Sequence, residues 1–217
     1  MAIFNRNNTK LEFLNFLRNS DIFTTSERGV TTKTDSGTTS ETGAETITLS
    51  ETNAKNVRSV TYDGTQLTYG EEYTININNY QVTLLAVVPG KDYEISFDYG
   101  SSDKIYSDYP RLDLTIESYP RIGFDIYGQT SETGGFGNVN MIRFLYNINI
   151  YAKSIGNAET YMDSLRSSVV NNQNNFYYIS YVKPRNVRQV EPIDVRGKNK
   201  VYMIGCDIES KNNYEIN

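Results

Sequence analysis

The residues that carry most enzyme chemistry are scarce in this sequence. Among its 217 residues there is no histidine and a single cysteine, Cys206. The absence of histidine excludes Ser-His-Asp and Cys-His catalysis and the common zinc sites. Cys206 stands in an apolar, strand-like stretch with no base to activate it, so we expect a buried, inert thiol. Carboxylate-only chemistry stays open, but no carboxylate pair has a recognisable context, and we expect a protein that is not an enzyme.

Acidic residues are frequent between positions 92 and 108. They are Asp92, Glu94, Asp98, Asp103 and Asp108. Their spacing is not that of a calcium-binding loop, and solvated strand faces explain them. We therefore expect no metal site and no cofactor.

A glycine-rich stretch lies between two predicted strands. It contains Gly134, Gly135, Phe136 and Gly137. A phosphate-binding loop needs a strand before it and a helix after it, whereas here a strand follows. We expect a hairpin tip that orders against a neighbouring subunit.

The only concentration of basic residues lies near the C-terminus. It comprises Lys183, Arg185, Arg188, Arg196, Lys198 and Lys200. Pro184 and Pro192 interrupt this stretch, which predicts a long loop or an irregular hairpin. It could face an acidic partner or DNA passing close by. The alternative is a solvated loop with Glu191 and Asp194 as counter-charges.

The whole chain is acidic and lacks long apolar runs. Its formal net charge of −5 excludes a general nucleic-acid binder. The N-terminus has no apolar run that would suit a signal peptide, and no stretch approaches the length of a transmembrane helix. We expect a protein that is made in a cytoplasm and does not enter a membrane.

The first third of the chain predicts a helix and then a β module. Leucines on one face indicate a helix over 9–20, with capping-box spacing between Thr9 and Glu12. A Thr, Ser and Gly-rich linker is expected over 31–44, with an edge strand near 28–34. Residues 45–104 alternate in strands with turns at Asp63-Gly64, 78–79 and 89–90, which is typical of a small β-sandwich.

Residues 105–217 show a different order of elements. A strand over 121–128 precedes a long alternating strand over 141–154, whose even-numbered residues form the core face. An amphipathic helix follows over 157–170, with Asn157 as its N-cap, and strands over 176–182 and 200–210 close the unit. The predicted fold class is α+β, a mostly antiparallel sheet with a packed helix, plus the small β-sandwich module.

This element order resembles the tail-terminator proteins of tailed viruses. The matching segments are LEFLNFLRN, YPRIGFDIYG, RFLYNINIYAKS, NAETYMDSLRSSV and RGKNKVYMIGCDIES. Pro120-Arg121-Ile122 corresponds to the start of the family's first long strand. The segment over 57–100 resembles Ig-like modules appended to virion proteins. Both resemblances together divide the chain into 1–30 (helix and strand), a linker 31–44, an Ig-like module 45–104 and a terminator-like core 105–217.

The resemblance implies a structural protein of the virion neck, made in the host cytoplasm. Such a protein forms a ring, usually a hexamer, that caps the tail tube and joins it to head-completion proteins, with DNA passing through the lumen. The strand 141–154, the helix 157–170 and the tip 131–138 would form the ring contacts.

Two other functions remain open at this stage. One is a head-completion stopper or connector, which shares composition and location with the terminator. The other is a carbohydrate- or surface-binding module that uses exposed tyrosines in a row. The candidates for that row are Tyr62, Tyr69, Tyr73, Tyr80, Tyr93 and Tyr99.

Overall fold

The protein consists of two compact units that alternate along the chain. The computed structural model describes residues 6–107, 115–133, 139–173, 175–195 and 199–215. Unit 1 comprises Met1–Arg28 and Lys104–Asn217, and unit 2 comprises Gly29–Asp103. Unit 2 thus begins well before residue 45, where we expected the β module to start.

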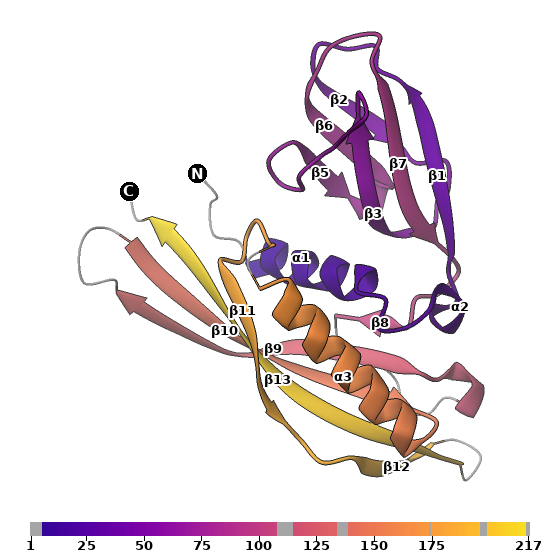
Figure 1. Ribbon diagram of the computed structural model, residues 1–217, viewed down its shortest axis with the longest axis vertical. Helices are drawn as coiled ribbons and strands as arrows, with labels where there is room; N and C mark the ends of the chain where they lie inside the picture. The colour runs from indigo at the N-terminus through magenta and orange to yellow at the C-terminus, as the bar shows by residue number, and fades with distance from the viewer. Residues whose placement is uncertain (1–5, 108–114, 134–138, 174, 196–198, 216–217) are drawn as a thin grey trace. The chain divides into compact units, whose positions relative to one another are not determined.

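Both units consist mainly of antiparallel strands, and the described α-helices all belong to unit 1 (Figure 1). Unit 1 contains α1 (Arg6–Asn19), α2 (Thr25–Arg28), β8 (Ile105–Tyr106), the 3-10 helix η2 (Ile116–Ser118), β9 (Arg121–Thr133), β10 (Val139–Ala152), α3 (Ile155–Asn171), β11 (Tyr181–Val187), β12 (Glu191–Val195) and β13 (Asn199–Glu215). Unit 2 contains β1 (Thr31–Thr38), β2 (Gly43–Thr48), β3 (Ala54–Tyr62), β4 (Thr65–Gln66), β5 (Tyr73–Asn76), the 3-10 helix η1 (Ile77–Asn79), β6 (Gln81–Val87) and β7 (Asp92–Tyr99).

Unit 2 has two antiparallel sheets that share one hydrophobic cluster. The strand orders are β1-β7-β3-β4 and β2-β6-β5. Buried side chains from both sheets meet in that cluster, among them Val57, Val60, Leu84, Ile95 and Phe97. The arrangement is compatible with the expected β-sandwich. The predicted turn at Asp63-Gly64 is confirmed, because both residues have positive φ (48° and 76°), as a tight two-residue hairpin turn requires.

The predicted linker over 31–44 is wrong, because most of it is strand. β1 pairs with β7 over its whole length, from Thr31↔Tyr99 to Thr38↔Asp92. Threonine favours extended backbone, and an edge strand needs few large apolar side chains. The Thr32 hydroxyl also donates to the buried Asp98 carboxylate at 2.6 Å. The strand that we expected to begin near residue 28 starts at Thr31, after α2.

β10 is the central strand of the unit 1 sheet. The strand order is β11-β13-β10-β9-β8, and β12 also pairs with β13. β10 pairs with β13 from Val139↔Glu215 to Ala152↔Tyr202, and with β9 from Asn140↔Thr133 to Tyr151↔Arg121. The predicted core face of β10 is confirmed, since its even-numbered residues Ile142, Phe144, Tyr146, Ile148 and Ile150 are all buried.

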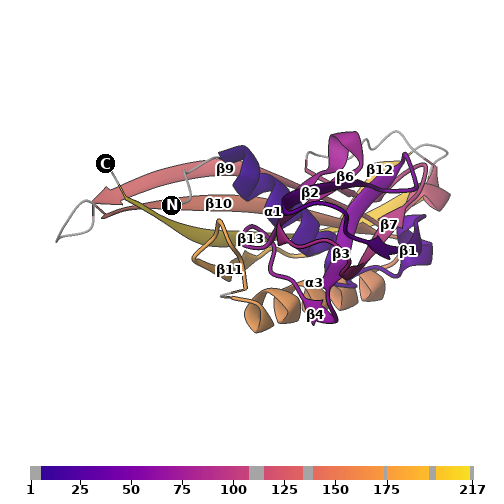
Figure 2. The same ribbon diagram turned by 90° about the horizontal axis from the view of Figure 1, so that it is seen from above.

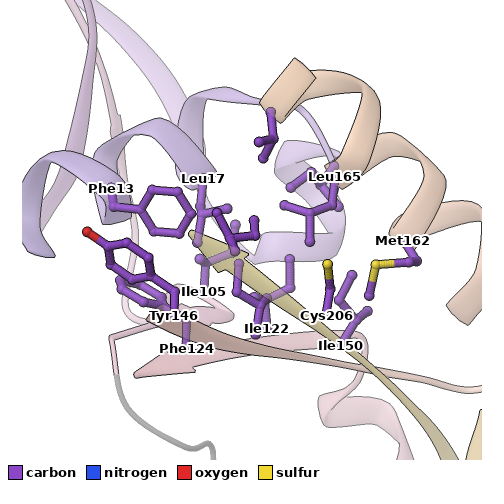
Figure 3. Packing of buried hydrophobic residues seen from close by; sticks show 14 of the residues in the cluster. Phe13, Leu17, Ile105, Ile122, Phe124, Tyr146, Ile150, Met162, Leu165 and Cys206 are labelled. Atoms are coloured by element: carbon purple, nitrogen blue, oxygen red, sulfur yellow. The ribbon is translucent and has the colours of Figure 1, made fainter. Parts of the chain in front are cut away.

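Helices α1 and α3 pack on this core face. Phe13 of α1 stacks on Tyr146 with ring centroids 4.5 Å apart, and meets Phe124 of β9 edge-on at 5.4 Å. Figure 3 shows these three rings side by side, with Met162 and Leu165 of α3 facing the same sheet. The predicted buried face of α3 is confirmed: Ala158, Met162, Leu165 and Val169 are all buried.

The helix ends differ from the sequence prediction in detail. Ser154, rather than Asn157, is the N-cap of α3, and its hydroxyl accepts from the Asn157 backbone N–H at 3.2 Å. The capping box at Thr9 and Glu12 is also wrong, because α1 begins at Arg6 and both residues lie buried inside it.

Glu12 holds the irregular segment between α3 and β11. Its carboxylate accepts the backbone N–H groups of Tyr177 at 2.5 Å and Tyr178 at 3.0 Å. The strand predicted over 176–182 therefore begins only at Tyr181. Burial raises the pKa of Glu12 to about 7, although these N–H groups act to lower it.

Replacing Phe13 by alanine should destabilise the protein by about 3–5 kcal/mol, because the change leaves a cavity between α1 and the sheet. Leu11→Ala is the matched control on the same helix, since Leu11 is 43% exposed and should cost less than about 1 kcal/mol. Urea denaturation measures both. Equal losses for the two variants would contradict this account of the core.

The Glu12 carboxyl should make stability depend on pH between 4.5 and 7. Its pKa is higher in the folded chain than the ordinary 4.5, so the folded state binds the proton more tightly. The stabilisation is fully present below pH 4.5 and is lost as pH rises to 7, on the order of 3 kcal/mol in total. We expect Glu12→Gln to remove this part of the pH dependence. The difference between the wild-type and variant unfolding free energies across that range tests it, and a flat difference would refute it.

Candidate interaction surface

The structure describes only part of the predicted interaction residues. The glycine-rich tip with Gly134, Gly135, Phe136 and Gly137 lies outside the described residues, and so do Arg196 and Lys198. The other three predicted residues, Lys183, Arg185 and Arg188, lie on β11 and directly after it. For this stretch we expected a long loop or an irregular hairpin. The long loop is wrong, because β11 and β12 are strands that both pair with β13, and the antiparallel pairing of β12 with β13 is compatible with the hairpin.

Two of these cations neutralise one buried carboxylate of β13. The Arg185 guanidinium binds Glu209 through Nε at 2.8 Å and through a second nitrogen, and Lys183 Nζ lies 3.7 Å from the other carboxylate oxygen. Burial alone would raise the pKa of Glu209. Hydrogen bonds and charge from Arg185, with the charges of Lys183 and Arg143, outweigh burial and hold the pKa below its ordinary value.

Arg188 crosses the sheet from β11 toward β10. It donates to Asp207 Oδ1 at 2.9 Å, to Asn147 Oδ1 at 3.1 Å and to Asn149 Oδ1 at 3.0 Å. The two asparagines also bond to each other at 2.9 Å. One guanidinium therefore connects β10 and β13 on the face of the sheet opposite the core.

Gly205 makes this crossing possible. Its carbonyl accepts the Arg188 backbone N–H at 2.8 Å. A Cβ at position 205 would overlap the Arg188 guanidinium nitrogens. A glycine inside a strand often marks such a close approach, and here it leaves room for the arginine to lie flat over β13.

The outer face of the sheet thus has two chemically different regions. The first is the polar network around Arg188 and Glu209, in which Asn149 is only 6% exposed. The second is an apolar cluster between the η2 region, β10, β12 and β13. Its buried members are Tyr119, Tyr151, Val195 and Val201. We call the polar region the Arg188 network.

The chemistry available in this network is binding and positioning. Its groups are paired ions and amides, with no nucleophile beside a base. The nearby Cys206 faces the core, and burial raises the pKa of its thiol to about 11, so it stays protonated at neutral pH. The basic residues are also less available to an outside partner than their number suggests, because Asp207 and Glu209 pair with them. The counter-charges that we expected, Glu191 and Asp194, are not the ones that bind them.

Sequence reasoning missed Asn147, Asn149, Gly205 and Asp207 as partners of the basic residues. Weak signals were present: the asparagines occupy the polar side of the alternation in β10, and Gly205 interrupts an apolar strand. The pairing of β11 with β13 could not be predicted from the sequence, and it is this pairing that places Arg188 over the two asparagines.

No known protein family and no curated protein sequence matches this chain. In the ranges that the structure describes, no group of three or more acidic, cysteine or histidine side chains is placed to hold a metal ion. None of the described helices is long and apolar enough to cross a membrane. The functional proposal therefore depends on the contacts of unit 1 itself.

Gly205→Ala should destabilise the protein by about 1–3 kcal/mol, because the new methyl group displaces the Arg188 guanidinium. The same substitution in an Arg188→Ala background should cost less than about 0.5 kcal/mol, since the obstacle is gone. A double-mutant cycle by urea denaturation measures the coupling. Additive losses would mean that Gly205 is needed for another reason.

Proposed function

We propose that this chain is a non-enzymatic structural protein of the head–tail junction of a tailed virus. In this proposal it is a tail-terminator subunit that forms a ring, a hexamer in the usual family pattern. The ring caps the tail tube, contacts head-completion proteins and lets DNA pass through its lumen. Unit 1 is the terminator-like core, and unit 2 is an Ig-like module inserted into it in sequence.

The observation that supports this most is the length of three strands in unit 1. β9, β10 and β13 continue well past α1 and α3, as the two perpendicular views agree (Figures 1 and 2). Of the helices that the structure describes in unit 1, none covers this end of the sheet. A sheet end that the helices of its own unit leave uncovered suits contact with a neighbouring subunit, because strands present both faces and an edge for pairing.

The free edge of β9 supports the same proposal. Within the described residues, β8 pairs with β9 only at Ile122 and Gly123, so most of β9 has a partner on the β10 side alone. The opposite edge strand β11 carries Lys183, Pro184 and Arg185, which are residues that discourage strand addition. The two edges are therefore unequal, and an unequal pair of edges favours association in one direction around a ring.

The charge of the chain is compatible with a DNA conduit. The net charge is −5, and the described basic residues Lys183, Arg185 and Arg188 are ion-paired within the chain. A lumen formed by such a protein would hold DNA weakly, which sliding requires. A stopper or connector at the same junction shares these properties.

A glycan-binding role has less support. Such a site needs several exposed aromatic rings in a row. Tyr73 is buried, and the other five candidate tyrosines are partly buried against the unit 2 core. Strand packing accounts for them.

The proposal predicts that the protein forms closed rings, alone or on tail tubes. Native mass spectrometry of the purified chain should give a single oligomer larger than a dimer, six copies in the usual pattern. If the free protein is monomeric, addition of assembled tail tubes should produce capped tube ends in negative-stain images. A chain that stays monomeric and also leaves tube ends bare would contradict the proposal.

A further inference from the structure

A polar pocket lies in unit 1 at the end of the sheet where β9 begins and β10 ends. Its volume is about 270 Å³. Five segments of the chain line it: α2, the residue before β8, η2 with the start of β9, the residue after β10 and the first turns of α3. The lining side chains used below are Lys104, Lys153, Glu27, Glu117, Asn157 and Tyr161. The Arg188 network contributes none of them.

Two lysines in this pocket lack a salt bridge. Among the described residues, no carboxylate lies within ion-pair distance of Lys104 or Lys153. Arg121 adds a third positive charge beside them, and its own position is fixed by a 2.9 Å hydrogen bond to the Ser118 carbonyl and by the rings of Tyr106 and Tyr119. Burial, then the charges of Lys153 and Arg121, lower the pKa of Lys104, and the attraction of Glu27 offsets only part of this lowering.

The two carboxylates of the lining offset this charge only in part. Glu27 attracts Lys104 and Glu117 attracts Lys153, but neither carboxylate forms an ion pair with its lysine, and Arg121 adds a further cation near Lys104. Hydrogen bonds hold Glu27 in place, since its two oxygens accept from the Tyr161 hydroxyl at 2.5 Å and from the Thr24 backbone and hydroxyl at 2.9 and 3.0 Å. Glu117 is exposed. The opening turn of α3 adds Asn157 to the lining, so the positive end of the helix dipole lies at the pocket.

We propose that this pocket binds a small oxyanion of the phosphate class between Lys104 and Lys153. A phosphate there would supply the negative charge that no carboxylate of the described chain brings within ion-pair distance. Asn157 would donate a further hydrogen bond. The proposal does not depend on the ring function, because every residue in it belongs to one unit of one chain.

Titration of the full-length protein with inorganic phosphate tests the site. Isothermal calorimetry at constant ionic strength, with sodium chloride as the matched salt, measures affinity. Lys104→Gln and Lys153→Gln should each weaken binding about tenfold. Lys200→Gln is the matched control, since Lys200 is an exposed lysine of the same unit that does not line the pocket, and it should leave affinity unchanged.

A variant that should strengthen binding shows whether the losses in the lysine variants could come from misfolding. Glu117→Gln removes a negative charge from the pocket and should strengthen phosphate binding about threefold. The proposal is overturned if the wild type binds phosphate no better than chloride. It is equally overturned if Lys200→Gln weakens binding as much as Lys104→Gln and Lys153→Gln do, or if Glu117→Gln leaves binding unchanged while the lysine variants remain folded by circular dichroism.

Discussion

Five side chains on one face of β10 form the surface against which unit 1 is assembled. Ile142, Phe144, Tyr146, Ile148 and Ile150 are all buried, and their strand pairs with a neighbour on each side over nearly its whole length. α1 packs its phenylalanines on this surface, and α3 adds a row of four apolar residues spaced for one helical face. A shift of β10 by one residue would turn these five side chains toward the outer face of the sheet. The register of the sheet therefore also determines the surface on which both helices pack.

The same register places polar side chains on the outer face of the sheet. Because the core takes the even positions of β10, Asn147 and Asn149 point to the other side, where Arg188 binds both. Partnered charges that are half-buried, as Arg188 and Asp207 are, contribute little net stability but leave few alternative arrangements, since loss of one partner leaves the other ion without compensation. The Arg188 network therefore helps to specify how β11 lies on β13. Lys183, Arg185 and Arg188 are ion-paired within the chain, which makes them less available as a DNA-binding patch.

The sequence predicts those parts of the structure that depend on local periodicity. Alternation in 141–154 and the four-three-four spacing from Ala158 to Val169 each identify a face without knowledge of the partner. Asp63-Gly64 is equally local, because few residue pairs suit a tight hairpin turn. The errors arise where distant segments decide the outcome. β1 is recognised as strand only through its pairing with β7, and Glu12 looks like a capping residue until the segment at 177–178 is placed beside it. The partners of Arg188 follow from strand order, which no short pattern in this chain encodes.

We propose that the end of the β9–β10–β13 sheet that the described helices of unit 1 leave uncovered joins neighbouring subunits into a ring at the end of a tail tube. A cryo-electron microscopy reconstruction of the protein bound to tail tubes tests it most directly. We expect a closed ring on the tube end in which this part of each sheet is covered by the next subunit. A ring whose subunits meet elsewhere, with this end of the sheet left in solvent, would contradict it.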